Sequence, residues 1–318
     1  LQTNEGTSTH WHGVPLVNPM DGVPGATQQA IARGEDFVYE FVAPTAGTYF
    51  YHSHVGLQLD RGLYGALIIE SAREQKNYDQ DVALVLDDWL DGMPGTPDDA
   101  MKKLIAGGDR MKMGAMGMSA MNLPPDLVYP TYLINGKPAE HPMEVNVKKG
   151  QKIRLRFINA AASTIFHVAL QGHQMIVTHT DGQPVEPVEV DAIRIGMGER
   201  YDVLVTATNP GVWQLVASVE GAIPQVRALF RYQGSAGQTP IATFAPPELK
   251  GKMLQYAMLK AAATIVVPPA DTPDLVVPLQ LSGGNGQYIW KINGQVFDQA
   301  AMIAIPKLSF ISFQYQNT

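Results

Sequence analysis

The sequence repeats one pattern of turns and strand endings at a fixed spacing, and this repeat limits the folds open to the chain. The segment "LINGKP" contains Asn135, and "RLRFIN" ends at Asn159, 24 residues later. The segment "KINGQV" contains Asn293, and "SFQYQN" ends at Asn317, again 24 residues later. Self-similarity at a constant period indicates copies of one structural unit. The chain is therefore predicted to contain the same small fold more than once.

The N-terminal part of the chain can be aligned with the same repeat. The segment "LQTN" ends at Asn4 and His12 follows eight residues on, just as His167 follows Asn159 by eight residues. "THWHG" therefore aligns with "TIFHV", and "FVAPTAGTYFYHSH" aligns with "VTATNPGVWQLVAS". We predict three copies of one module, at residues 1–72, 81–235 and 275–318.

Each module is predicted to consist of β-strands. Short runs rich in β-branched and aromatic residues alternate with turns that contain glycine and proline, a pattern typical of sandwiches and barrels. Examples are "FVYEFV" (37–42), "YFYHSH" (49–54), "GLYGALIIE" (62–70), "KIRLRFIN" and "RYDVLVTA". One helix is predicted in "TPDDAMKKLIAG", where Thr96 is the N-cap and Pro97 lies in the first turn. The predicted fold class is all-β.

The composition excludes several classes of function. The net charge is -7 and the sequence pI is about 5.6, which argues against nucleic acid as a partner because phosphate binding needs clustered Lys and Arg. No apolar run approaches the roughly 18–20 residues that span a bilayer, so we predict no membrane span. The chain contains no cysteine, which excludes disulfides and thiolate metal ligands within it.

Two His-x-His pairs are the strongest chemical signal in the chain. "STHWHGVPL" contains His10 and His12, and "YFYHSHVG" contains His52 and His54. Side chains in a strand alternate between faces, so the two histidines of a pair point the same way, roughly 7 Å apart. If the two strands are neighbours, four imidazoles converge. Imidazole is a ligand for copper, zinc, iron and nickel, and copper(II) binds most tightly among divalent ions, so we predict a copper site.

The repeat offers an internal test of this interpretation. A single His-x-His pair is often a polar surface feature or a set of satisfied core histidines. The aligned positions of the second module hold Ile165, His167, Val216 and Ser218. Folding of the module therefore does not require the histidine pairs, and a function of the first module explains them better. The remaining histidines lack a partner at strand spacing and are interpreted as structural or surface residues; they are His141, His167, His173 and His179.

The segments "STHWHGVPLVNPMDGVPG" and "GTYFYHSHVGLQLDRGLYGALIIE" resemble the multicopper oxidase family, which includes laccases and bacterial copper-tolerance oxidases. "RLRFINAAASTIFHVALQGHQM" and "MGERYDVLV" resemble the middle domain of that family. The resemblance covers residues 1–235 and, weakly, the remainder. It implies tandem cupredoxin-like Greek-key β-sandwiches that oxidise a substrate one electron at a time at a type 1 copper and reduce O₂ to water at a trinuclear copper cluster.

The resemblance also implies roles for individual residues. His10 would be a ligand of the type 2 copper, and His12, His52 and His54 would be ligands of the type 3 pair. Asp21, in "NPMDGVPG", stands where family members often carry a carboxylate that is thought to assist proton delivery. The alternative for Asp21 is a turn residue before Gly22.

The sequence departs from the family pattern at the other half of the copper centre. The family supplies those ligands through a His-Pro-x-His-x-His motif and a His-Cys-His motif, and neither motif occurs in this sequence. The first module lacks the strands that would precede its Asn4, and the third stops where a histidine pair would follow. We therefore expect the sequence to be an excerpt of a longer protein that carries the type 1 copper elsewhere.

A methionine-rich insert lies at residues 101–121 and contains "MKMGAMGMSAM". Thioethers favour Cu(I), which would suit copper tolerance or oxidation of Cu(I). The alternative is a loop of adaptable, gap-filling side chains.

Three functions remain open on these observations. The first is a laccase-like multicopper oxidase that takes O₂ and a phenol, an aromatic amine or a metal ion such as Cu(I). The second is a non-catalytic copper-binding or copper-tolerance protein, and the third is a scaffold that has lost its metal. The resemblance implies an exported protein, periplasmic or extracellular. A homo-oligomer is left open.

Overall fold

The structure, a computed structural model, describes the chain in nine stretches; they are residues 5–72, 76–93, 95–106, 127–220, 225–263, 272–283, 288–296, 299–307 and 309–317. The chain divides into two compact units. Unit 1 comprises Leu1–Pro94 and Tyr129–Ile265, and unit 2 comprises Gly95–Val128 and Val266–Thr318. The first module, defined above by the repeat, lies in unit 1, as does the second module apart from residues 95–128. Most of the methionine-rich insert lies outside the described residues.

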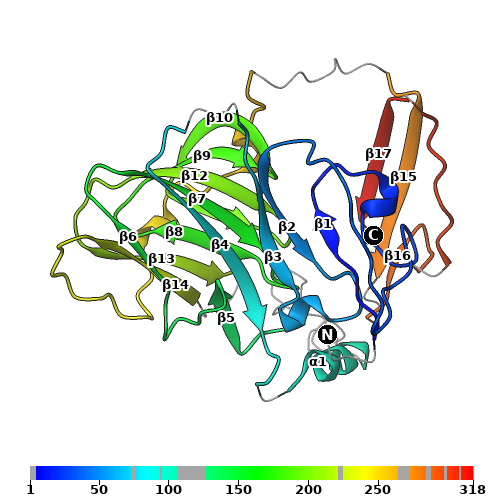
Figure 1. The fold of residues 1–318 in the computed structure, drawn as a ribbon, viewed down its shortest axis with the longest axis horizontal. Coiled ribbons are helices and arrows are strands. Elements are labelled where there is room, and N and C mark those ends of the chain that lie inside the picture. The colour runs from blue at the N-terminus through cyan, green and yellow to red at the C-terminus, as the bar shows by residue number, and fades with distance from the viewer. Residues whose placement is uncertain are drawn as a thin grey trace. The chain divides into compact units, whose positions relative to one another are not determined.

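The first module contains one antiparallel sheet in the order β1-β2-β3. Its strands and 3-10 turns are β1 (His10–His12), η1 (Asn18–Met20), β2 (Gly47–His52), η2 (Leu59–Arg61) and β3 (Tyr64–Ile69). Figure 1 shows these strands in blue, with β3 next to β4 of the second module. Phe50 of β2 forms a buried cluster with Ile158 and Ala160 of the second module, which joins the two modules through a common apolar core.

The second module consists of two sheets. The six-stranded sheet has the order β10 (Gln183–Val190), β9 (Met175–Thr180), β12 (Arg200–Thr206), β7 (Lys152–Asn159), β4 (Gln80–Trp89) and β5 (Thr131–Ile134). The five-stranded sheet has the order β11 (Ala192–Ile195), β8 (Phe166–Leu170), β13 (Val212–Val219), β14 (Gln225–Tyr232) and β6 (Glu144–Val147). The turns η4 (Pro247–Lys250) and η5 (Tyr256–Met258) follow. Strands of both sheets supply fully buried aromatic side chains, among them Phe157, Phe166 and Phe230. The predicted all-β fold is confirmed.

Unit 2 contains α1 (Pro97–Ile105) and a sheet in the order β16 (Trp290–Ile292), β15 (Leu275–Gly283) and β17 (Ile311–Asn317). The helix begins as predicted, because the Thr96 side chain accepts a hydrogen bond from the Asp99 backbone N–H. No helix among the described residues is both long enough and apolar enough to cross a membrane.

The repeated Asn-Gly turns adopt one conformation in both copies. Asn135 and Asn293 have positive φ angles of 49° and 52°, and each side chain accepts a hydrogen bond from the backbone of the neighbouring strand, at Val85 and Gln280. An asparagine tolerates this left-handed conformation better than most residues. In both copies a strand pairs in parallel with a partner that ends at the repeated Asn, β4 with β7 and β15 with β17.

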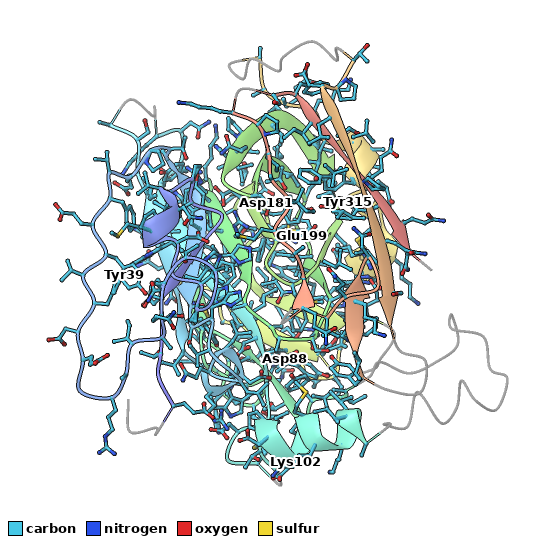
Figure 2. The ribbon with its side chains drawn as sticks, turned by 90° about the vertical axis from the view of Figure 1, so that its right-hand side faces the viewer. Tyr39, Asp88, Lys102, Asp181, Glu199 and Tyr315 are labelled. Atoms are coloured by element: carbon cyan, nitrogen blue, oxygen red, sulfur yellow. The ribbon has the colours of Figure 1, made fainter. Side chains whose placement is uncertain are left out.

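Two expectations of local structure were wrong. Residues 37–42 form no strand, because no neighbouring strand among the described residues pairs with their backbone, and a strand needs such a partner. Tyr39, labelled in Figure 2, is held through its side chain instead: its hydroxyl accepts from the Thr9 N–H and donates to Gln28 Oε1. In addition, β2 ends at His52, so His54 lies in the turn after the strand.

Candidate metal centre

Strand pairing brings the two histidine pairs together. β1 and β2 are antiparallel neighbours in which His10 lies opposite His52 and Trp11 lies opposite Tyr51. Because directly paired residues point to the same face, His10, His12 and His52 share one face of the sheet. Trp11 points to the other face, where its ring contacts Tyr39, Phe41 and Tyr51.

The imidazole rings occupy a small volume. The ring centroid of His10 lies 5.7, 5.3 and 5.6 Å from those of His12, His52 and His54. One ring nitrogen from each of His10, His12 and His52 lies within 4.8 Å of the other two, an arrangement that can hold a metal ion. His54 lies beside this group, with its ring stacked on His52 at 5.9 Å between centroids, but contributes no nitrogen to the set of three.

Backbone carbonyls fix which nitrogen of two rings can bind a metal. Nδ1 of His10 lies 2.8 Å from the Asp21 carbonyl oxygen, and Nδ1 of His52 lies 2.9 Å from the Ser53 carbonyl oxygen. A carbonyl only accepts hydrogen bonds, so each Nδ1 carries the proton and donates it. The lone pair of each ring is then on Nε2. Metal-ligating histidines in proteins have this same arrangement, with the second nitrogen donating to a carbonyl or carboxylate.

His12 differs from His10 and His52, because it turns Nδ1 rather than Nε2 toward the other imidazoles. Its Nδ1 lies 3.3 Å from Nε2 of His52. Two ring nitrogens at this separation either share a proton or face one cation. The ring of His12 stacks on Phe50 with 4.4 Å between centroids, which covers one face of the imidazole.

Burial keeps two of the rings, those of His12 and His52, neutral. Burial lowers the pKa of His12 to about 3, with further lowering by the Arg200 guanidinium and by the neighbouring histidines. Burial also lowers the pKa of His52, against the opposing effect of its hydrogen bond to Ser53. A neutral imidazole has a lone pair to offer, so these two side chains are in the protonation state that binds metals at neutral pH.

Asp21 lies beside the ring of His10. Its carboxylate Oδ1 is 3.5 Å from Nδ1 of His10, and one third of the side chain is exposed. The loop can approach β1 this closely because the next residue is Gly22, whose φ is +78° and where a Cβ would lie only 1.8 Å from the Thr9 carbonyl oxygen. Asp21 therefore both ends the η1 turn and places a carboxylate at the histidine cluster.

A buried glutamine that the sequence analysis did not single out connects the two histidine pairs. Gln58, fully buried, donates to the Gly6 carbonyl oxygen at 2.8 Å. Its Oε1 accepts from the hydroxyl of Thr7 at 2.9 Å and from that of Ser53 at 2.6 Å. Gly6 and Thr7 precede His10, and Ser53 separates His52 from His54. One side chain therefore fixes the spacing of both ligand segments.

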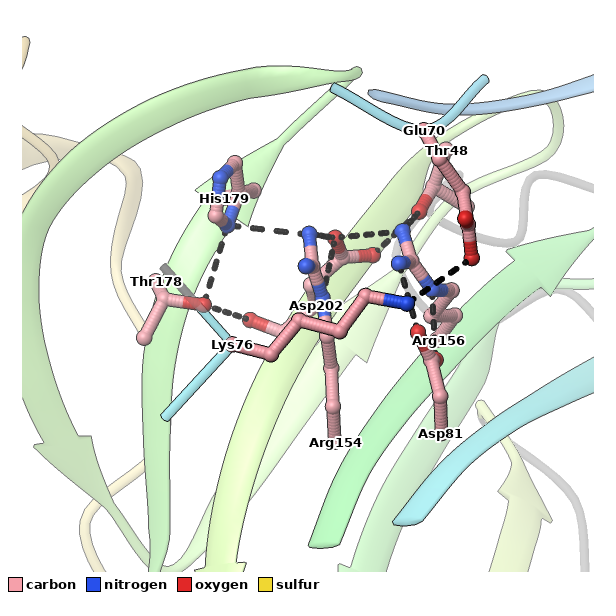
Figure 3. A network of polar contacts seen from close by, with 9 residues as sticks. All are labelled: Thr48, Glu70, Lys76, Asp81, Arg154, Arg156, Thr178, His179 and Asp202. Atoms are coloured by element: carbon pink, nitrogen blue, oxygen red, sulfur yellow. Dashed lines mark hydrogen bonds and ion pairs between the residues drawn. The ribbon is translucent and has the colours of Figure 1, made fainter. Parts of the chain in front are cut away.

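A buried ionic network joins β2 of the first module to the six-stranded sheet (Figure 3). Arg154 donates to Asp202 at 2.6 Å, and Arg156 donates to Asp81 and to the Thr48 hydroxyl at 2.6 and 2.8 Å. Thr48 also donates to Asp202 at 2.6 Å. Such a network is strongly destabilised when one partner is removed, so it holds the sheet that carries the histidines against the second module.

The aligned strand pairs of the two modules differ in register. In the first module His10 lies opposite His52, whereas in the second module Val216 lies opposite Ala169 and Ser218 lies opposite His167. The shift is an even number of residues, so side chains keep the same faces. His167 forms an ion pair with Glu220 at 2.9 Å between Nε2 and Oε2.

The other three histidines also lie apart from the cluster. His173 is buried and its Nε2 is 2.6 Å from the Tyr232 hydroxyl. His179 lies 3.8 Å from Asp202, at the edge of the ionic network. His141 is exposed in a turn. Within the described parts of the chain, the cluster of His10, His12 and His52 is the one group of such ligands that could hold a metal ion.

A cluster of three imidazoles on a β-sheet packed against a β-sandwich defines a protein with a candidate metal centre. Family models described as multicopper oxidase match residues 2–74 and 81–235. The chain belongs to the multicopper oxidase family, whose cofactor is copper.

Individual relatives agree with this assignment. The chain is 43% identical over 301 residues to the multicopper oxidase MmcO of Mycobacterium tuberculosis, covering 92% of this chain and 58% of the relative. It is 40% identical over 231 residues to copper resistance protein A of Escherichia coli, covering 64% of this chain and 38% of the relative. The chain thus spans about half or less of the length of these relatives.

Solved structures show the same fold. The multicopper oxidase Fet3p matches with a TM-score of 0.75 at 22% identity, over 92% of this chain and 54% of that one. Laccase from Botrytis aclada matches with a TM-score of 0.66 at 26% identity, also over 92% and 54%. The predicted cupredoxin-like β-sandwich architecture is confirmed.

Proposed function

We propose that this chain is part of a laccase-like multicopper oxidase, which oxidises its substrate one electron at a time and reduces O₂ to water. The observation that carries the proposal is the set of His10, His12 and His52 nitrogens, all within 4.8 Å of one another. We assign His10 to the type 2 copper and His12, His52 and His54 to the type 3 pair. Bound copper would supply the one-electron redox chemistry and the binding of O₂.

The donor set fits copper. His10 and His52 hold their protons on Nδ1 through carbonyl acceptors and turn Nε2 toward the group. His12 faces the same volume with Nδ1. Neutral imidazoles without carboxylate ligands suit copper better than calcium or magnesium, which take oxygen ligands.

Asp21 is proposed to handle protons. Reduction of O₂ to water consumes protons, and a carboxylate can hold one and release it to a nearby acceptor. The Asp21 carboxylate lies 3.5 Å from Nδ1 of His10 and is partly exposed, so it reaches both the cluster and solvent. Its turn position and this role are compatible.

The substrate class follows from the relatives and is part of the proposal. Relatives are named laccase, L-ascorbate oxidase and copper resistance protein A. We propose phenols, aromatic amines or metal ions such as Cu(I) as reductants, and an exported protein in the periplasm or outside the cell. We also propose three cupredoxin-like domains: the first at residues 1–72, without its N-terminal strands, the second at residues 81–235, and the start of the third at residues 275–318. A type 1 copper with a cysteine ligand would need residues outside this sequence, which has no cysteine.

The test uses the full-length gene product loaded with copper. O₂ uptake with a phenolic substrate is measured for the wild type, His12→Ala and the control His167→Ala, which removes the aligned histidine of the second module. We expect O₂ uptake to be lost in His12→Ala and retained in His167→Ala. Equal O₂ uptake in all three proteins would refute the assignment, and copper binding without O₂ uptake in the wild type would favour the non-catalytic copper binder.

A further inference from the structure

One turn of the second module touches the ring of His12. Residues 196–199 connect β11 to β12, and Gly198 has a φ of +79°. A Cβ on Gly198 would lie 2.8 Å from Cε1 and 3.0 Å from Nε2 of His12, but 3.9 Å from Nδ1. The backbone of the second module therefore occupies the space along the Cε1–Nε2 edge of the ring, and the Nδ1 edge is the one left to face His52.

The turn is itself rigidly held. The Gly198 N–H donates to the Asn159 carbonyl oxygen at 2.9 Å, and the Gly196 N–H donates to the Glu199 carboxylate at 2.6 Å. Asn159 is fully buried, and its side chain donates to the Thr164 and Ile195 carbonyl oxygens. A turn with these bonds cannot move away from the ring without breaking buried hydrogen bonds.

Arg200 fastens the same turn to the first module. Its guanidinium is buried, donates through Nε to the Thr48 carbonyl oxygen at 3.2 Å and through Nη1 to the Gly198 carbonyl oxygen at 2.8 Å. The residue after His12 is Gly13, where a Cβ would lie 2.3 Å from Nη2 of Arg200. The arginine therefore fills the space beside the ligand strand that a side chain at position 13 would need.

We infer that the turn at residues 196–200 of the second module is a positioning element for the His12 imidazole, with Gly198 against the ring edge and Arg200 fixing the turn to β2. Phe50 covers the ring face, and Gly198 closes the Cε1–Nε2 edge. The inference rests on the proposed function in treating His12 as a copper ligand. It gives the second module, which has no cluster of its own among its described residues, a part in the copper site.

The test compares two glycine substitutions that carry the same backbone strain. Gly198 and Gly234 have φ angles of +79° and +78°, but a Cβ at Gly234 meets nothing within 4 Å. Gly198→Ala and Gly234→Ala are made in the full-length protein, and Cu(II) content, Cu(II) affinity and the EPR spectrum are measured. Outer-shell substitutions at metal sites weaken binding by about 10–100-fold. We expect this loss of Cu(II) affinity, and a changed EPR spectrum, in Gly198→Ala alone. The backbone strain lowers the Tm of both variants, and the contact with the His12 ring lowers it further in Gly198→Ala.

A measurement on copper-free protein separates this inference from the proposed function. The ring ¹⁵N signals of His12 report its tautomer and surroundings without metal. We expect the His12 signals to shift in Gly198→Ala and to stay unchanged in Gly234→Ala. This expectation does not depend on copper uptake. A wild type that takes up no copper would refute the proposed function and leave this inference standing. If Gly198→Ala does not fold, Arg200→Lys, which keeps the charge and loses the forked bonds, replaces it with the same expectation. Unchanged His12 signals and unchanged Cu(II) affinity would overturn the inference.

Discussion

The strand pairs β1–β2 and β8–β13 of unit 1 both carry histidines, with His167 aligned to His12, and the surroundings of these histidines are opposite. On β1 and β2, His10 and His52 donate from Nδ1 to backbone carbonyls and keep Nε2 free for a ligand. On β8, Nε2 of His167 is paired with the Glu220 carboxylate, which Arg194 also holds. The position of a histidine on the scaffold is therefore insufficient for a metal site. What decides is which ring nitrogen the neighbouring groups occupy.

The two strand pairs also differ in what their side chains contribute to stability. β8 and β13 are almost wholly buried, and Val216, the aligned counterpart of His52, is fully buried. β1 is only half-buried along its length. The second module uses these positions for packing, and the first module uses them for imidazoles.

The largest expected effect is on Cu(II) affinity, and it distinguishes the ligand positions of the first module from the packing positions of the second. His52→Ala removes a proposed ligand and should weaken Cu(II) binding at least about 100-fold, or about 3 kcal/mol, while the Tm of the copper-free protein hardly changes. Val216→Ala removes buried methyl groups and should lower the free energy of unfolding by about 1–3 kcal/mol with no change in Cu(II) affinity. Copper titration and denaturant unfolding of both variants give the two quantities.

The comparison fails if both variants change the same quantity. Loss of Cu(II) affinity in Val216→Ala would mean that packing of the second module sets the site as strongly as a ligand does. Unchanged Cu(II) affinity in His52→Ala would remove His52 from the ligand set.

A smaller effect is expected at two fully buried glutamines, one in each module. Gln58 binds groups on both histidine segments, and Gln214 donates to the Phe244 carbonyl oxygen in the second module. Gln58→Leu and Gln214→Leu each leave buried polar groups without a partner, which costs about 1–3 kcal/mol in each case. Only Gln58→Leu should also lower copper content per chain. Equal copper content in the two variants would show that Gln58 stabilises the fold without setting the spacing of the ligands.

Much of this arrangement was predictable because it is local in the sequence. Strand alternation predicts that His10 and His12 share a face, and the Asn-Gly turns at Asn135 and Asn293 follow from residue type. The segment 37–42 was misjudged because its composition favours a strand, while a strand also needs a partner that sequence cannot supply. The register of β8 against β13 could not be predicted from the sequence, because an even shift preserves every buried face and the hydrophobic pattern does not distinguish such alignments.

The groups around the ligands were missed for a related reason. Gln58, Gly198 and Arg200 stand inside segments quoted for their family resemblance, but their contacts to Gly6, His12 and Thr48 join distant parts of the chain. The positive φ of Gly198 and the burial of Arg200 are properties of the packed fold. A glycine followed closely by an arginine before the strand was the signal available in sequence, and it does not say what the two residues touch.

A pH-dependent effect is expected where the modules meet. Asp87 of β4 is buried and accepts a hydrogen bond from the Tyr64 hydroxyl of β3 at 2.6 Å. Burial raises the pKa of Asp87 to about 8, against the opposing effect of the Tyr64 hydrogen bond and with added raising by Asp88. A carboxyl whose folded pKa is raised binds more protons when folded, so its contribution to stability is lost as pH rises from about 4 to about 8.

Asp87→Asn removes this titration and keeps a similar shape. Relative to the wild type, the variant should gain free energy of unfolding steadily as the pH rises from 5 to 8. Urea unfolding at the two pH values measures the difference, with Asp79→Asn on an exposed turn as the control. A difference between wild type and Asp87→Asn that is the same at both pH values would show that Asp87 does not titrate in this range.

The smallest effect is expected at the ion pair that distinguishes His167 from the cluster. The pKa of Glu220 is lowered by its hydrogen bonds from Arg194 and, less strongly, from His167, so its contribution to stability is present above about pH 4.5 and is lost as the pH falls through its folded pKa. The Glu220 side chain is 36% exposed, and solvent screening limits the loss in Glu220→Gln to about 0.5 kcal/mol near neutral pH. The variant leaves Nε2 of His167 without its carboxylate, yet no other imidazole converges on it within the described residues. Copper content should therefore stay at the wild-type value, and an additional copper per chain in Glu220→Gln would show that removing one carboxylate is enough to turn the second module into a metal site.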